Sequence, residues 1–297
     1  MNMKSHCIVY TGIAVFLTIA ASCSSPSTTN PPKKPPEAEN TMIIDHAAAD
    51  IDAIPQAAIE QAKATLHIAY GHTSHGSQLV TGMSGLLGFK GDLYSFNSGG
   101  SGGALDLTDY AFSGAYDLGN PDRSAWATAT RDYLDTHPGA NVVIWSWCGQ
   151  VSYASEDDIV LYLGLMDGLE ADYPNVKFVY MTGHLDGSGL TGNLHLRNEQ
   201  IRAYCAANEK ILYDFADIET YNPDGVYFGD KRPNDNCDYD NNGDGTIDGN
   251  WAIEWQNAHP GEWYNCASEH SQPLNANQKA YAAWWLWARL AGWEGPG

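Results

Sequence analysis

Residues 64–78 read ATLHIAYGHTSHGSQ, a short apolar run followed directly by a polar segment. Its apolar part, continuing to Tyr70, predicts a core strand because β-branched and aromatic residues favour strands. A polar segment with two histidines, two serines and two glycines follows directly, from Tyr70 to Gln78. Because open parallel sheets carry their functional residues after the carboxyl ends of strands, we expect a site here.

The rest of the chain alternates predicted strands and helices. Further strands are expected at 141–147, 176–181 and 211–215, and helices at 55–66, 156–170, 198–208 and 277–291. Strands that alternate with helices favour a parallel sheet covered on both faces. We therefore predict an α/β fold, with three layers (α/β/α) around a central parallel sheet.

The first 22 residues have the pattern of a signal peptide. Lys4 precedes an apolar run from Cys7 to Ala21, which is shorter than the roughly 20 residues that a membrane-spanning helix needs. The small residues 20–22 directly before Cys23 resemble a bacterial lipobox. This predicts an exported lipoprotein of the outer membrane or cell surface with Cys23 lipidated; simple secretion, or a periplasmic location, is the alternative.

Residues 23–40 are rich in Pro, Ser and Thr and predict an extended tether, because such a segment cannot bury apolar surface. Residues 41–297 suit one large α/β domain. The formal net charge is −21, from 36 acidic against 15 basic residues, which argues against a nucleic-acid partner. Membrane contact is expected through the lipid anchor alone.

Four cysteines remain in the domain, and in an exported protein they suggest two disulfides with three possible connectivities. We expect Cys237 to pair with Cys266 and Cys148 with Cys205. Their spacings are too long for zinc pairs of the C-x-x-C kind.

Other chemistry-bearing groups follow the predicted strands. They are Asn97–Gly102 (NSGGSG), Cys148–Gln150 (CGQ), Thr182–His184 (TGH) and, before the last helix, Ser268–His270 (SEH). Nucleophilic catalysis needs a serine, a histidine within hydrogen-bond reach and backbone donors for the oxyanion. These parts occur in a suggestive order along the chain.

The chain resembles the SGNH, or GDSL-like, hydrolase superfamily in three blocks. HTSHG is similar to a divergent H-x-S-x-G version of its first block, which implies Ser74 as nucleophile. Asn97–Gly102 matches N-x-G-x-S-G, which implies that Gly99 joins Ser74 as an oxyanion donor. His270 precedes a helix rich in small residues, which implies a general base. The resemblance also implies the flavodoxin-like fold of that superfamily.

Two departures from the family pattern concern the remaining groups. The third block is normally G-x-N-D, but SWCGQ stands there, so Gln150 is the candidate side-chain donor to the oxyanion. The last block is normally D-x-x-H, yet Ala267 lies three positions before His270. A serine–histidine dyad, the neighbouring Glu269, or an acid from elsewhere in the chain are the alternatives.

The histidines allow a second hypothesis. His72 and His75, with His67 or His184, could ligate a catalytic zinc ion, although no H-E-x-x-H motif occurs. If zinc is absent, His72, His75 and His184 are candidates to line the substrate pocket, and no cofactor is expected for catalysis.

A calcium loop is predicted within an insertion near residues 237–254. Oxygen ligands fall at positions 1, 3, 5, 7 and 9 of an EF-hand-like loop, and Gly245 stands at position 6 for the sharp turn. The candidate ligands are Asp240, Asn242, Asp244, Thr246 and Asp248. Trp251 replaces the usual Glu at position 12, and Glu254 lies farther on.

The sequence thus predicts a surface-tethered serine esterase acting on a small-molecule or carbohydrate ester, with acyl groups on a polysaccharide as one candidate substrate. Ser74 and His270 carry the reaction. Trp255 and Trp263 are the candidates for stacking on a sugar. The alternatives are a non-catalytic, calcium-stabilised carbohydrate-binding lipoprotein and a zinc-dependent hydrolase.

Overall fold

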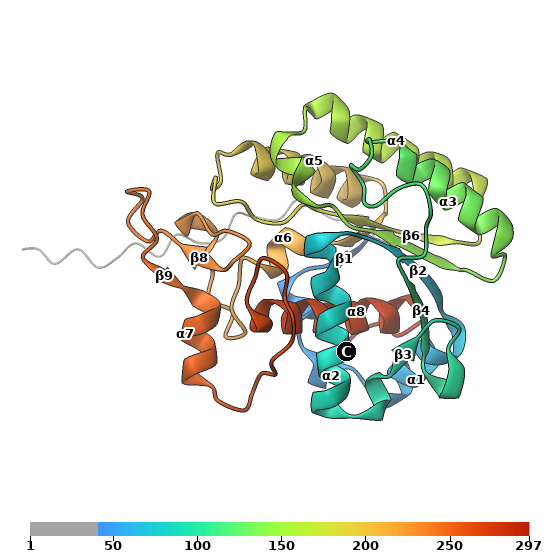
Figure 1. Cartoon of the computed structure of the whole chain (residues 1–297), viewed down its shortest axis with the longest axis horizontal. Helices are drawn as coiled ribbons and strands as arrows, with labels where there is room; N and C mark the ends of the chain where they lie inside the picture. The colour runs from blue at the N-terminus through green and yellow to red at the C-terminus, as the bar shows by residue number, and fades with distance from the viewer. Residues whose placement is uncertain (1–40, 297) are drawn as a thin grey trace, which may run out of the picture. The chain divides into compact units, whose positions relative to one another are not determined.

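The computed structural model describes residues 41–296, which contain a seven-stranded parallel sheet (Figure 1). The strand order is β1-β7-β6-β5-β2-β4-β3. The strands are β1 (Met42–Ile44), β2 (His67–Gly71), β3 (Phe96–Asn97), β4 (Leu105–Asp109), β5 (Val142–Trp145), β6 (Lys177–Met181) and β7 (Ile211–Tyr213).

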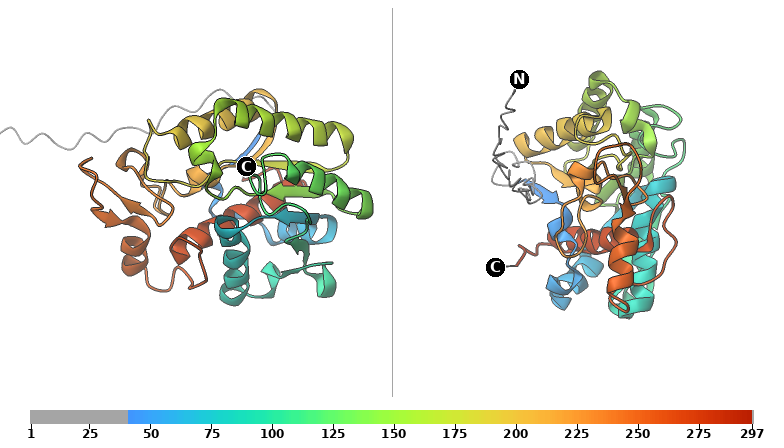
Figure 2. Two further views of the ribbon diagram at one scale, coloured as in Figure 1. Left: turned by 45° about the horizontal axis from the view of Figure 1, so that its top comes forward. Right: turned by 90° about the vertical axis from the view of Figure 1, so that its left-hand side faces the viewer.

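Helices cover both faces of this sheet (Figures 1 and 2). One face carries α1 (Gln56–Thr65), α2 (Ser77–Lys90) and the long α8 (Pro273–Leu290). The other carries α3 (Ala125–Thr136), α4 (Glu156–Asp172) and α5 (Asn193–Ala207). The predicted three-layer α/β/α architecture is therefore confirmed.

The topological switch point of the sheet lies beside the polar segment 70–78. Five strands in the order β4-β2-β5-β6-β7 follow the doubly wound pattern 2-1-3-4-5, in which a crevice opens between the first and third strands. Those strands are β2 and β5 here. Ser74 follows β2, so it lies at the place where this class of sheet binds its ligands.

Several elements escaped the sequence prediction. The edge strands β1 and β3 have three and two residues, too short to show a period. Strand β4 (LDLTD) alternates apolar and acidic residues, and α3 lies in a stretch that was assigned to no element. The predicted helix at 198–208 begins five residues earlier, at Asn193.

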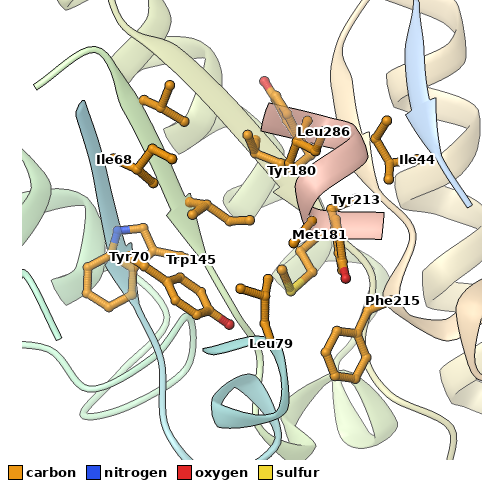
Figure 3. Close-up of a cluster of buried hydrophobic side chains, with 14 of the residues drawn as sticks. Ile44, Ile68, Tyr70, Leu79, Trp145, Tyr180, Met181, Tyr213, Phe215 and Leu286 are labelled. Carbon is orange, nitrogen blue, oxygen red and sulfur yellow. The ribbon is translucent and has the colours of Figure 1, made fainter. Parts of the chain in front are cut away.

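The core lies between the sheet and its two helical layers. Figure 3 shows sheet residues such as Tyr70, Trp145 and Met181 meeting Leu79 of α2 and Leu286 of α8. All five are at most 2% exposed. The apolar strands are thus buried on both faces, as parallel sheets require.

A small lobe formed by residues 224–263 lies beside the sheet (Figure 1). It contains α7 (Trp251–Ala258) and the antiparallel hairpin of β8 (Asp238–Tyr239) and β9 (Gly249–Asn250). Its own apolar cluster includes Phe228, Trp251 and Trp255. Trp255 is only 8% exposed, so burial leaves it no face for a sugar, and Trp263 packs against the same cluster.

The expected disulfides are absent among the described residues, where all four cysteines are free. Cys205 is fully buried in α5, and burial raises the pKa of its thiol. The Cys237 sulfur lies 3.6 Å from the Ser271 hydroxyl, and the Cys266 sulfur accepts from the Asn277 side chain at 3.5 Å. Both predicted pairings are therefore corrected.

The predicted signal peptide, the predicted tether and Cys23 lie outside the described residues. The described residues, 41–296, all belong to one compact unit. Among them, no helix has both the length and the apolar character needed to cross a membrane.

A buried ion pair connects three helices under the carboxyl edge of the sheet. Lys279 Nζ of α8 lies 2.5 Å from Glu219 Oε1, which directly follows α6 (Phe215–Ile218), and both side chains are fully buried. Lys279 also donates to the Gln78 side chain of α2. Glu219 accepts from the Leu185 N–H at 2.7 Å. Burial lowers the pKa of Lys279, and Glu219 partly opposes that shift.

We predict that Lys279→Met destabilises the fold by about 3–5 kcal/mol, because Glu219 is left buried without its cation. The double variant Lys279→Met/Glu219→Gln should recover part of this loss. The exposed Lys177→Met control should change stability by less than about 0.5 kcal/mol. Urea unfolding measures all three, and equal stability of the single variant and wild type would contradict the role of the pair.

Candidate active site

Ser74 lies in a sharp turn between β2 and α2. Its φ angle is +37°, in the left-handed region that non-glycine residues rarely adopt. Such strained residues cluster at functional sites, where the surrounding structure holds them in place. A serine at the end of a strand, presented on a strained strand-to-helix turn, has the geometry of an activated nucleophile.

Close packing explains the glycine and aromatic residues around this turn. A Cβ added at Gly76 would lie 2.1 Å from Ser146 Oγ, so only glycine allows the turn to approach the end of β5. The Tyr70 hydroxyl donates to the Gly76 carbonyl at 2.8 Å. The Thr73 hydroxyl donates to buried Asp117 at 2.5 Å. These contacts hold the backbone of the turn from both sides of Ser74.

His270 meets Ser74 from the other end of the chain. The His270 Nε2 atom lies 2.5 Å from Ser74 Oγ, although 196 residues separate them. The segment before α8 that carries His270 is fixed by the Gln78 side chain, which donates to the Glu269 carbonyl. His270 also has a positive φ, +61°. The structure therefore joins the two predicted catalytic residues in a hydrogen-bonded dyad.

The usual orienting acid is not hydrogen-bonded to this histidine. Among residues 41–296, no carboxylate contacts the His270 ring. The Glu269 charge instead acts on Tyr110, whose pKa is raised by burial and by the charges of Asp109 and Glu269. Of the alternatives left open by the sequence, the geometry is that of a dyad.

Three imidazole rings form a stack in which His270 is an outer ring. His75 packs on His270 with centroids 4.6 Å apart, and His184 packs on His75 at 3.6 Å with an interplanar angle of 8°. His75 and His184 are 6% and 8% exposed. The His75 Nε2 atom lies 2.8 Å from Asp235 Oδ2, which comes from the lobe.

The charges in this stack follow from burial and from that hydrogen bond. Burial lowers the pKa of His75, against the raising effect of Asp235, so His75 is neutral at pH 7. Burial opposes ionisation of Asp235, but the His75 hydrogen bond and the nearby histidines outweigh it and lower its pKa. The unit of His75 and Asp235 thus carries one negative charge beside His270.

This cluster also bears on the zinc hypothesis. The ligand atoms of His75, His184 and Asp235 lie within 4.8 Å of one another. Imidazole lone pairs lie in the ring plane, however, and two nearly parallel rings direct them side by side rather than to one point. Zinc needs nitrogens at about 2.0–2.1 Å in tetrahedral directions, so this arrangement does not fit the ion.

His72 and His67 do not join the cluster. The buried His72 ring pairs with Asp109 at 2.7 Å and packs between Tyr70 and Tyr110. His67 pairs with Asp106 at the opposite end of β2. The zinc set of His72 and His75 with His67 is therefore not assembled. Of the three pocket candidates, His75 and His184 lie behind the dyad and His72 lies under the turn.

Gly99 is not brought to Ser74. Its N–H donates to Asp106 Oδ1 at 2.7 Å, and β-sheet register pairs Asp106 with His67, the first residue of β2. Ser74 lies beyond the last residue of that strand, about 13 Å away along it at about 3.3 Å per residue. The oxyanion role that the family resemblance implied for Gly99 is corrected, because the loop follows an edge strand and not a neighbour of β2.

Gln150 follows β5 as expected, but its amide is engaged elsewhere. Its Nε2 donates to Asp117 at 2.9 Å, and its Oε1 accepts from the Cys148 N–H at 2.9 Å. Asp117 in turn holds Thr73. Gln150 thus supports the nucleophile turn through Asp117 and, in this arrangement, donates to no oxyanion.

The predicted calcium loop lies at the tip of the lobe hairpin. The Asp240 carboxylate accepts from the Gly243 and Gly245 N–H groups at 2.7 and 2.8 Å, and Asp248 accepts from Asn241. Asn242 and Asp244 each accept from the backbone two residues later, at Asp244 and Thr246. In the described part of the chain, tight groups of three potential ligands occur at two other places and not in this loop.

A separate cavity of about 280 Å³ opens after β1 and β7 and is lined in part by His46, His195 and Arg202. Neither member of the dyad lines it. Arg202 is already paired with Asp214 at 2.6 Å, so the cavity has no free cation in that residue.

Asp235 is the residue that sequence reasoning missed. It lies in an irregular loop 160 positions after His75, outside every family block, and no local pattern marks it. Strand β4 is a second omission. Its alternating sequence LDLTD is the signal that could have identified it, and β4, not β3, is the neighbour of β2.

No protein-family model matches the chain, and no curated protein is found to be similar to it.

Proposed function

We propose that the protein is a serine hydrolase that cleaves carboxylic esters, with Ser74 as nucleophile and His270 as general base. The observation that carries this proposal is the 2.5 Å contact between Ser74 Oγ and His270 Nε2. It is supported by the strained turn at Ser74 and by its place at the switch point of the sheet.

The reaction proceeds in two acyl-transfer steps. His270 removes the Ser74 proton as Oγ attacks the carbonyl carbon, and the Ser74 backbone N–H donates to the developing oxyanion. The tetrahedral intermediate collapses, and His270 returns the proton to the leaving alcohol. A water molecule, deprotonated by His270, then hydrolyses the acyl enzyme and releases the acid.

The His75–Asp235 unit stabilises the imidazolium that His270 becomes. Its single negative charge lies behind the ring face, at stacking distance through His75. It therefore supplies part of the electrostatic stabilisation that a triad carboxylate gives, without contacting the reacting atoms. His75 and Asp235 are positioning residues in this mechanism.

Export as a surface lipoprotein and a structural calcium ion complete the proposal. The loop 240–248 supports calcium by its spacing of oxygen ligands. The hairpin that carries it leads to Asn236, whose side chain accepts from Gln272 at 2.7 Å, two residues after His270. A bound ion would therefore stiffen the segment that presents the base.

A second candidate is a non-catalytic, calcium-stabilised carbohydrate-binding lipoprotein. It is favoured by one observation, that no carboxylate of the described residues orients the His270 ring.

We predict that wild-type protein hydrolyses p-nitrophenyl acetate and is labelled at Ser74 by a fluorophosphonate. Ser74→Ala should lower kcat by at least about 1000-fold, because the nucleophile is lost while binding remains. Release of p-nitrophenol and mass spectrometry measure this, with circular dichroism to verify folding. Absence of both turnover and labelling in the wild type would support the binding protein.

We predict that Asp235→Asn lowers kcat about tenfold, a cost of about 1.4 kcal/mol, because the imidazolium loses a nearby negative charge. The acidic limb of the pH profile of kcat/KM should move to lower pH, since loss of a nearby negative charge disfavours the protonated form of the base. The other titratable groups near the stack are Glu219, Glu269 beside His270, and Cys148, whose Sγ lies 3.9 Å from His75 Nδ1.

The exposed Asp157→Asn variant serves as the control for charge removal and should leave the profile unchanged. A fall in kcat for Asp235→Asn with no movement of the acidic limb would show that Asp235 acts only on folding.

We predict that calcium raises the melting temperature by about 5 °C at saturation, because an ion that binds only the folded state stabilises it. Asp244→Asn should remove most of this shift. Differential scanning calorimetry with calcium, magnesium and a chelator measures it; an equal shift with magnesium, or none with either ion, would refute a calcium site in the loop.

A further inference from the structure

A pocket lined by aromatic residues opens beside the nucleophile turn. Its volume is about 410 Å³, within the range of small-ligand sites. Residues 71–73 of the nucleophile turn form one wall, residues 110–116 of the loop after β4 form another, and Trp145 of β5 completes it. We call this the aromatic pocket.

The aromatic pocket adjoins the dyad at two points. Thr73 lines the pocket and precedes Ser74 directly. Tyr110 lines it as well, and the charge of Glu269, the residue before His270, is among the causes that raise the pKa of Tyr110, after burial and Asp109. A ligand group bound in the pocket therefore lies near enough to Ser74 for an ester on the same molecule to reach its hydroxyl.

The floor of the pocket is rigid and apolar. Phe112 stacks on Trp145 with centroids 4.2 Å apart, and the buried Trp145 indole donates to Thr130 Oγ1 at 2.9 Å. One face of Phe112 is thereby covered, so the pocket does not form an aromatic cage of the kind that binds ammonium groups.

The rim offers exposed tyrosine rings instead. Tyr110 and Tyr116 are 61% and 65% exposed, so part of each ring surface is open to a ligand at the rim. Each combines an apolar ring with a hydroxyl group. Ser113 lies between them in sequence and adds another hydroxyl to the lining.

Charge decides which ligands suit this pocket. Its lining contains no Lys or Arg, and the neighbouring charges, Asp109 and Glu269, are both negative. An anionic ligand would be repelled. A neutral pyranose ring fits, because its C–H face packs on a tyrosine ring while its hydroxyls bond with polar groups at the rim.

We propose that the aromatic pocket binds a neutral pyranose ring, which makes the substrate an O-acylated neutral sugar. This rests on the proposed esterase function and names its substrate class. The sugar occupies the aromatic pocket, and its ester group extends past Thr73 to Ser74.

The test compares three esters: an acetylated methyl xylopyranoside, ring-free ethyl acetate, and methyl ferulate with its aromatic acyl group. For the acetylated sugar, Tyr116→Ala should raise KM about tenfold and lower its kcat/KM relative to that of ethyl acetate by a similar factor. Tyr116→Phe should keep most of the wild-type preference. Tyr153→Ala, which removes an equally exposed tyrosine outside the pocket, should change nothing.

Binding gives a second readout that needs no turnover. Saturation-transfer NMR should detect unacylated methyl xylopyranoside on the Ser74→Ala protein and a much weaker signal when Tyr116→Ala is added. Sugar binding without turnover of any ester by wild type would overturn the esterase and leave the pocket standing. Ester turnover with no sugar binding, or a Tyr116→Ala defect confined to methyl ferulate, would overturn the pocket's assignment.

Discussion

One buried ion pair, Lys279 with Glu219, fixes the relation between the two halves of the site. Lys279 extends from α8 to Gln78, in the first turn of α2, and Gln78 donates in turn to the backbone of Glu269. Ser74 lies just before α2 and His270 just before α8. An unpaired buried charge at this place would destabilise the fold. The two helices therefore keep the relative position that brings Ser74 and His270 together.

The dyad is supported from different parts of the molecule. Ser74 depends on the sheet, because Tyr70, Asp117 and Gly76 hold its turn against β5. His270 depends on the lobe, through Asp235 behind the imidazole stack and Asn236 at Gln272. The sheet thus fixes the position of Ser74, and the lobe places Asp235 and Asn236 next to the His270 segment.

The fold was predictable because long apolar strands and helices have clear periods, and Ser74 and His270 because short motifs mark them. Gly99 was misplaced because its motif was accepted without the strand register, which pairs its loop with the wrong end of β2. Asp235 could not be predicted, since a contact across 160 residues depends on how an irregular loop packs. The cysteine pairings failed because spacing does not reveal that Cys205 is enclosed in the core.

Because His270 lies next to the lobe, its contact with Ser74 can be lost without unfolding of the whole domain. The lobe has its own small cluster of apolar residues, distinct from the main core, and can act as a cooperative unit of lower stability. Its opening would release Asp235 and the His270 segment while the sheet, with Ser74, stayed folded. Mild heat or denaturant would then separate Ser74 from His270 before the sheet unfolds, and amide exchange in residues 224–263 would detect this opening earlier than any probe of the sheet.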